Sequence, residues 1–265
     1  MKLTITHTTR YCYDTPVNYG LQQVRLTPVS GPMQTVLDWN IDIVGGNSEL
    51  QFADQHKNQT LLVQADQNAT EVIFTASGTV DTIDTAGVLG NVYGPVPLWH
   101  FRQHTARTTP GKAIRALARD LNNSVDLLAD LHALSVSILS AAPYNTTSTI
   151  AGTTAEEALQ LGGGVCQDHS QIFIAAARAA GIPARYVSGY LMMDGRVDQD
   201  ASHAWAEAHI DGLGWVGFDV SNGISPDERY VRIAVGRDSK EAAPISGMRL
   251  GNANESMIVS LQVQQ

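Results

Sequence analysis

The sequence has few cysteines, few aromatic residues and few basic residues, and it has no long apolar run. Two of its 265 residues are cysteine, which excludes a framework of several disulfides. Lysine and arginine number 17 against 26 aspartates and glutamates, for a formal net charge of −9. Since nucleic acids and anionic membrane surfaces attract basic patches, we expect neither as a partner. No run of about 18 apolar residues is present, so no membrane-spanning helix is expected.

What remains is the composition of a globular protein. Hydrophobic residues make up 43% of the chain and charged residues 16%, and a chain of this length can bury a full core. The first residues, Met-Lys-Leu-Thr-Ile-Thr-His-Thr, lack the apolar core of a signal peptide. We therefore expect a cytoplasmic protein in which Cys12 and Cys166 are both reduced.

Secondary-structure signals divide the chain into two parts. Short β-prone runs separated by Gly, Pro, Asn and Asp fill residues 1–85 and predict a small antiparallel sandwich. A connector rich in Gly and Pro follows over 87–97. We expect a β-rich domain over 1–90 and an α+β core over 91–265.

The second part opens with helical signals and closes with strands. Thr109 before Pro110 is typical of a helix start. A stretch beginning at Cys166 carries apolar residues at helical spacing and stops before Gly181-Ile-Pro. Strands are expected over 184–193, 203–210, 215–220 and 229–235.

Cys166 is the most informative residue of the chain. It ends the run Gly-Gly-Gly-Val-Cys and begins the expected helix. Backbone N–H groups at a helix start favour the thiolate, which is the nucleophilic form of cysteine. The preceding glycines allow a sharp turn and a close approach of a substrate. A thiol nucleophile needs a base and a group that orients the base, and His203 and Asp219 follow in order downstream.

The expected hairpin places this base and its partner together. Residues 203–210 alternate strictly, with His203 on the face opposite the alanines. Turn formers over 211–214 lead into a return strand from Trp215. A register in which Asp219 lies opposite Trp205 puts Asp219 diagonal to His203 on the same face, whereas a slip of one residue would separate them. Asn222 and Glu207 are the next candidates to orient His203.

The motifs around these three residues resemble those of the bacterial transglutaminase-like family. This family belongs to a superfamily of thiol enzymes that includes proteins regarded as cysteine proteases. The run from Tyr11 to Pro28 is similar to the family's β-rich N-terminal domain. The other matching segments are 162–169, 181–190, 203–207, 214–219, 236–238 and 243–245.

This resemblance implies a papain-like, transglutaminase-like core in which the cysteine helix packs on an antiparallel sheet. It also implies that Cys166 is the nucleophile, His203 the general base and acid, and Asp219 the orienting carboxylate. The chain departs from the family pattern at His169-Ser170 and at Ser239, where aromatic residues are common. Both departures concern the shape of the cleft and leave the triad intact.

The reaction expected is acyl transfer at the carboxamide of a peptide or protein substrate. Hydrolysis by a cysteine peptidase or amidase is the first hypothesis. Transfer to an amine, as in a transglutaminase, uses the same triad. A binding or assembly protein that keeps the fold without turnover is the alternative from another class.

Neither a cofactor nor a metal is expected. His100 and His104 are spaced to share a metal on a helix, but no third ligand lies near them in the sequence. The acidic loop from Asp194 to Asp200 lacks the spacing of a calcium-binding loop. We interpret it as a solvated loop beside the cleft.

Overall fold

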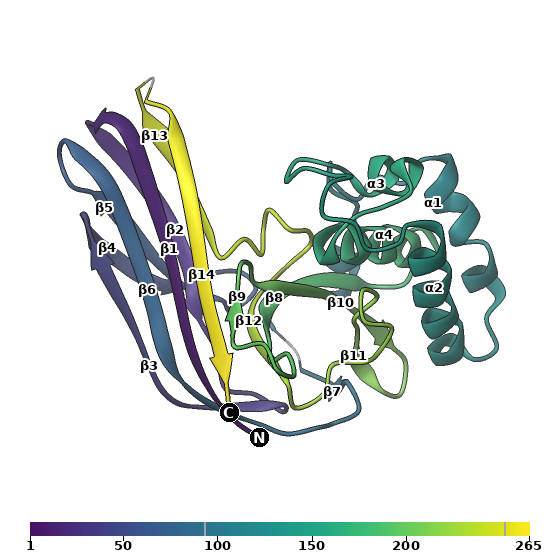
Figure 1. Ribbon diagram of the computed structural model, residues 1–265. Coiled ribbons are helices and arrows are strands. Elements are labelled where there is room, and N and C mark those ends of the chain that lie inside the picture. Colours follow the sequence, from purple (N-terminus) through teal and green to yellow (C-terminus); the bar gives the residue numbers. More distant parts are fainter. Residues whose placement is uncertain (93, 252) are drawn as a thin grey trace.

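The computed structural model describes residues 1–92, 94–251 and 253–265, and it consists of a β-sandwich beside a unit of helices and sheet (Figure 1). The strands are β1 (Lys2–Val17), β2 (Tyr19–Thr27), β3 (Gln34–Val44), β4 (Gly46–Ala53), β5 (Gln59–Ala65), β6 (Ala69–Thr82), β7 (Val88–Gly90), β8 (Ala184–Leu191), β9 (Asp198–Gln199), β10 (His203–Ile210), β11 (Gly214–Phe218), β12 (Tyr230–Gly236), β13 (Ile245–Leu250) and β14 (Glu255–Gln264). The helices are the 3₁₀ turns η1 (Leu98–Arg102) and η2 (Asp120–Asn123) and the α-helices α1 (Lys112–Leu117), α2 (Leu127–Ala141), α3 (Ala155–Leu161) and α4 (Cys166–Ala179).

Two antiparallel sheets form the sandwich. Their strand orders are β3-β6-β1-β14-β9 and β13-β2-β5-β4. Alternate residues of β1 and β2 are buried, as expected for strands with one face on a core. Val24, Val63 and Phe74 are fully buried between the two sheets. Because the predicted β-rich segment forms this sandwich, the predicted fold class is confirmed for the first part of the chain.

The last strands of the chain also belong to the sandwich. β13 pairs with β2, and β14 pairs with β1 along most of its length, so both ends of the chain lie at one end of the sandwich (Figure 1). The assignment of residues 245–264 to the core, as part of 91–265, is therefore wrong. The edges of β1 and β2 needed partners, and this long-range pairing satisfies their backbone N–H and C=O groups.

The remaining sheet, of order β12-β8-β10-β11-β7, carries the helices on one face (Figure 1). α4 packs against β10, whose alanines share a core with Ile172 and Phe173. The small alanine side chains let the helix approach the sheet closely. This is the expected cysteine helix on an antiparallel sheet, so the α+β, papain-like class is confirmed. Within the described residues, no helix combines the length and the apolar character needed to cross a membrane.

The start of α1 differs from the sequence prediction. Thr109 bonds back to the carbonyl of Thr105 and does not cap the helix. The carboxylate of Glu156, at the start of α3, accepts hydrogen bonds of 2.9–3.0 Å from the N–H groups of Gly111, Ala113 and Ile114. An anion at the positive end of the helix supplies the cap from another element.

Candidate active site

Cys166 is the first residue of α4, as predicted. Asp168 fixes the turn that leads into it, because its carboxylate accepts bonds from the N–H of Val165 at 2.9 Å and from the hydroxyl of Thr149 at 2.6 Å. Gly164 lies so close to this carboxylate that an added Cβ would come within 2.7 Å of the Asp168 Cβ. The thiol is therefore held by a rigid loop at a helix start, and it is partly exposed.

His203 and Asp219 meet in the expected hairpin. Ala206 faces Phe218 and Ile210 faces Gly214, and continuing this register by one residue places Asp219 opposite Trp205, as predicted. Nε2 of His203 lies 2.6 Å from Oδ2 of Asp219. The side chains are 9% and 1% exposed. A charge-assisted bond of this length, shielded from water, fixes the plane of the imidazole ring.

Two further residues hold the carboxylate of Asp219. Oδ2 accepts bonds of 2.7 Å from the Tyr230 hydroxyl and from Nδ2 of Asn222. In the sequence, Asn222 is a candidate only to replace Asp219 as the partner of His203, and no local signal points to Tyr230, which β12 brings in from the far side of β8. Glu207 is not the partner of His203. Its carboxylate is buried and accepts hydrogen bonds from Arg185 and Arg232.

The charges at the site favour a protonated histidine. Burial alone would lower the pKa of His203, but hydrogen bonds with Asp219 and Cys166 and the charge of Asp219 outweigh it and raise the pKa to about 10. Burial acts to raise the pKa of Asp219, yet its bonds from His203, Asn222 and Tyr230 hold it below the usual value. Since Nε2 of His203 is bonded to Asp219, Nδ1 is the atom left for Cys166.

We therefore expect His203 to titrate several pH units above a free imidazole. His7, whose pKa burial lowers to about 4, is an internal comparison that stays neutral above pH 5. Nitrogen-15 NMR of the histidine rings from pH 5 to above pH 10 should show His203 titrating while the His7 signals stay constant. Cys166→Ala should lower the His203 midpoint, because it removes one of the bonds that favour the imidazolium. A His203 midpoint near 6.5 in the unmutated protein would contradict the proposed pairing.

Cys166 and His203 line a cleft of about 590 Å³, and Asp219 is buried behind His203. Cys166 and Gln167 line one side, and the segment from Gln199 to Ala204 lines another. β9 in this second wall pairs with β14, so the sandwich supports one side of the cleft. A cleft of this volume accommodates a peptide side chain and its flanking backbone.

The two departures from the family pattern have structural roles beside the cleft. His169 is fully buried, and Nε2 donates to the carbonyl of Ala142, so Nδ1 accepts from the Ser221 hydroxyl at 2.8 Å. This bond ties α4 to the loop that carries Asp219. Ser239 donates to Gln171 at 3.0 Å and lines the cleft. A small residue at this position leaves space that an aromatic ring would fill.

Other candidate sites from the sequence are not assembled as ligand clusters. Asp200 pairs with Arg196, and Asp198 accepts from Gln262, so these aspartates do not converge. His104 bonds to the backbone carbonyl of Thr108 and does not join His100. His100 instead approaches two residues that are distant in the sequence, His56 and Glu241.

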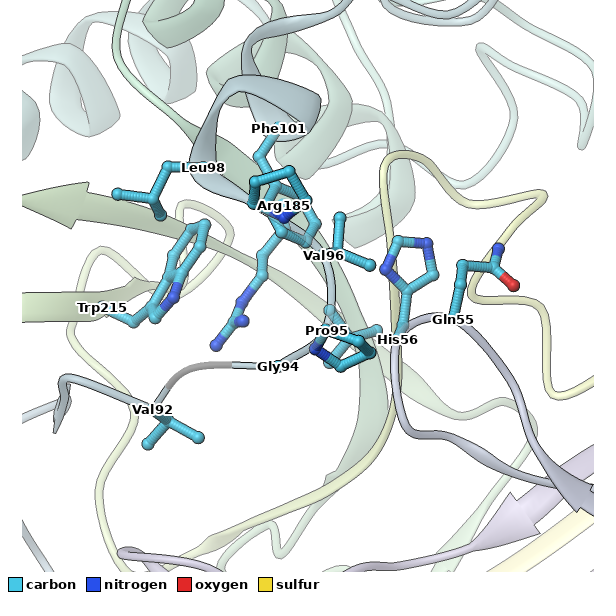
Figure 2. A pocket seen from close by; sticks show the side chains of 12 residues that line it. Gln55, His56, Val92, Gly94, Pro95, Val96, Leu98, Phe101, Arg185 and Trp215 are labelled. Atoms are coloured by element: carbon cyan, nitrogen blue, oxygen red, sulfur yellow. The ribbon is translucent and has the colours of Figure 1, made fainter.

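A separate pocket of about 250 Å³ lies near η1 (Figure 2). His56, Arg185 and Trp215 are among its lining residues. The guanidinium of Arg185 stacks 3.8 Å from the centre of a Trp215 ring and pairs with Glu207. Its charge is therefore already compensated, and no thiol lines the pocket. The cleft at Cys166 remains the candidate active site.

Tyr230→Phe tests how Asp219 is held. The phenylalanine leaves the carboxylate of Asp219 with its bonds from His203 and Asn222. The rate of Cys166 alkylation should therefore stay within about tenfold of that of the unmutated protein. The free energy of unfolding should fall by about 1.5–3 kcal/mol, because a buried hydrogen bond to a charge is lost. Urea unfolding and alkylation rates measure the two effects, and Tyr11→Phe in the sandwich is the matched control. If the alkylation rate fell by more than a hundredfold, the hydroxyl of Tyr230 would have a role beyond positioning Asp219.

Two family models match separate regions of this chain. Residues 107–220 match the model of the transglutaminase-like superfamily, and residues 3–81 match that of the bacterial transglutaminase-like N-terminal region. The Mycobacterium leprae protein ML0607 is 25% identical over 275 residues, covering 99% of this chain and 98% of that protein. The Mycobacterium tuberculosis protein Rv2569c is 37% identical over 131 residues, 45% of this chain and 42% of that protein.

A solved structure shares the fold over the whole chain. It is the crystal structure of a "Putative Cysteine Protease" from Cytophaga hutchinsonii, with a TM-score of 0.78 and 24% sequence identity. The match covers 100% of this chain and 91% of that one. Residues 107–220 therefore belong to the transglutaminase-like superfamily and residues 3–81 to the N-terminal region of its bacterial members, in a chain that shares the fold of this solved structure throughout.

Proposed function

We propose that this protein hydrolyses a carboxamide bond of a peptide or protein through the thiol of Cys166. The observation that carries the proposal is the position of Cys166 at a helix start, in a cleft, beside an imidazole that a buried carboxylate holds. His203 is bonded to Asp219 at 2.6 Å, and its pKa is raised to about 10 in part by the Cys166 thiol. An ion pair of thiolate and imidazolium is the resting state this arrangement favours.

In the proposed first step, the thiolate attacks the carbonyl carbon and the C–N bond breaks. The oxyanion accepts hydrogen bonds from backbone N–H groups of the first turn of α4, where Cys166 and Gln167 line the cleft. Nδ1 of His203 donates its proton to the departing amine. The products of this step are a free amine and a thioester on Cys166.

In the second step, neutral His203 takes a proton from water as the oxygen attacks the thioester carbon. The carboxylic acid leaves and the thiolate–imidazolium pair is restored. Asp219 remains ionised throughout, because Asn222 and Tyr230 also donate to its carboxylate. An amine in place of water would give transfer instead of hydrolysis.

The test is activity profiling against peptide and glutamine-amide libraries, with and without an added primary amine. Release of free acid from a subset of peptides, unchanged by the amine, is the expected result. Incorporation of the amine into the acyl product would show that the reaction is amine transfer and would contradict the proposed hydrolysis. Product analysis by mass spectrometry distinguishes the two, since the acid and the substituted amide differ in mass.

Iodoacetamide separates an enzyme from a binding protein on the same fold. An active thiolate is alkylated rapidly near neutral pH, whereas a structural cysteine reacts slowly. Peptide mapping then gives separate rates for Cys166 and Cys12. Equal, slow rates at both cysteines, together with no product from any library, would support the binding or assembly alternative.

A further inference from the structure

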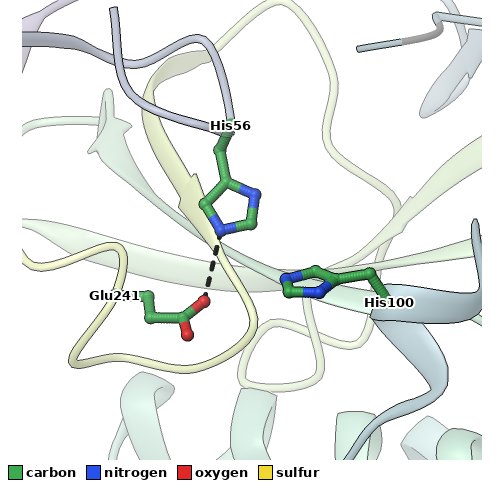
Figure 3. Close-up of side chains that lie close together, drawn as sticks. All are labelled: His56, His100 and Glu241. Atoms are coloured by element: carbon green, nitrogen blue, oxygen red, sulfur yellow. Dashed lines mark hydrogen bonds and ion pairs between the residues drawn. The ribbon is translucent and has the colours of Figure 1, made fainter. Parts of the chain in front are cut away.

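Three side chains outside the cleft converge from segments that are far apart in the sequence (Figure 3). His56 lies in the turn between β4 and β5 of the sandwich, His100 in η1, and Glu241 in the loop after β12. One donor atom of each lies within 4.8 Å of the other two. Nε2 of His56 is 3.2 Å from Oε2 of Glu241. The cluster therefore joins the sandwich to the core.

The two imidazoles have buried nitrogens that nothing in the described residues satisfies. Nε2 of His100 is buried without a hydrogen-bond partner. Nδ1 of His56 also has no partner, whereas Nε2 of His56 is the nitrogen that faces Glu241, and the His56 side chain is 1% exposed. Figure 3 shows the outer end of the His100 ring directed toward His56 and Glu241. An orphaned nitrogen directed at two other donors points to a missing ligand.

The carboxylate is already oriented for such a ligand. Nε of Arg237 donates to Oε1 of Glu241 at 2.8 Å, which leaves Oε2 on the side of His56. The backbone N–H of Arg237 also donates to Oε2 at 2.9 Å. Carboxylates that bind metals are commonly held by hydrogen bonds of this kind. Arg237 thus fixes the carboxylate while one oxygen remains directed at the imidazoles.

We propose that His56, His100 and Glu241 bind one divalent transition-metal ion, for which Zn²⁺ is the best match to the donor set. Two imidazoles and a carboxylate form a known zinc set, with water in the fourth position. At a zinc–nitrogen bond length of about 2.1 Å, two donors on one ion lie at most about 4.2 Å apart. Binding would therefore bring the three donor atoms, which now lie within 4.8 Å of one another, closer together.

The ion would join the sandwich to the wall of the cleft. Glu241 is followed directly by Ala242, Ala243 and Pro244, all of which line the cleft beside Cys166. Binding at Glu241 would therefore restrain this segment. The site itself involves none of the residues that carry the proposed hydrolysis, so either proposal stands if the other fails.

The experiment measures metal binding to the full chain carrying Cys166→Ala. This change removes the competing thiol of the cleft, where Cys166 and His203 could themselves bind zinc. Titration with Zn²⁺, and with Co²⁺ followed by absorption, should give one ion per chain without a thiolate charge-transfer band. His100→Ala in the same background should weaken binding more than about a hundredfold, since loss of a group that only supports a ligand already costs about 10- to 100-fold.

His104→Ala is the matched control, because His104 lies four residues further on and bonds to the Thr108 carbonyl. The His104→Ala variant should bind Zn²⁺ with the same affinity as the Cys166→Ala protein from which it is made. If His100→Ala fails to fold, histidine nitrogen-15 NMR of the parent decides: Zn²⁺ should shift His56 and His100 and leave His104 and His132 in place. The proposal is overturned if less than one fifth of an ion binds per chain, if both variants bind equally, or if other histidines shift.

Discussion

Replacing Cys166 by alanine is expected to lower turnover more than a thousandfold while the fold is retained. Without the thiol no acyl-enzyme forms, and the activity left is what binding and the oxyanion donors provide alone. Cys166 is partly exposed and the change in volume is small, so the free energy of unfolding should change by less than about 1 kcal/mol. The rate constant kcat on a substrate from the library, together with urea unfolding, measures both effects.

Cys12→Ala is the control for this experiment. Cys12 lies in β1 of the sandwich and pairs with Ser256 of β14, remote from the cleft in the chain's architecture. Its loss should leave the rate and the alkylation of Cys166 unchanged. If Cys166→Ala kept more than a thousandth of the activity, covalent catalysis by this thiol would be excluded and another nucleophile would have to be sought.

Replacing Asp219 by alanine is expected to produce the second largest loss, about ten-thousandfold in kcat. A loss of this size follows removal of the triad carboxylate in serine proteases. His203 would lose both its orienting bond and the charge that stabilises its protonated form. The same variant should bring the His203 midpoint down and slow alkylation of Cys166 near neutral pH. Stopped-flow alkylation measures the reactivity of the Cys166 thiolate without a substrate.

Asp219→Asn should be milder, because the structure controls which way the amide points. Asn222 and Tyr230 both donate to Oδ2, so the amide oxygen should occupy this position and still accept from Nε2 of His203. The tautomer is kept and only the charge is lost, which corresponds to about 10- to 150-fold in rate. Adding Tyr230→Phe should make the loss of rate larger, because the Tyr230 hydroxyl is one of the two donors that orient the amide. An asparagine variant as active as the unmutated protein would mean that the charge of Asp219 is not used.

The local patterns of the chain predict much of the core. Strict alternation over 203–210 and the turn formers after it predict the hairpin, and the requirement that Asp219 and His203 share a face selects the register that the structure shows. The apolar spacing after Cys166, with Gly181 beyond it, specifies α4 and its start. These signals succeed because each depends on residues within one or two elements, where the periods of strand and helix are visible in the sequence.

Three features required the tertiary structure. The sequences of β13 and β14 do not indicate which sheet they join, and only the free edges of β2 and β1 decide that they return to the sandwich. Glu156, rather than Thr109, caps α1. Tyr230 reaches Asp219 because β12 lies in the same sheet as β10. In each case the partner is distant in the sequence and is set by which edges and faces remain uncovered.

The three candidate residues and the two elements that carry them could be identified from local patterns alone, because a helix start and a strand face are local properties. The tertiary structure decided what surrounds them: the donors to Asp219, the wall of the cleft supported by β9 and β14, and the convergence of His56, His100 and Glu241. Such convergence has no periodic signal along the chain. It arises only when the sandwich and the core pack against each other and bury polar groups between them.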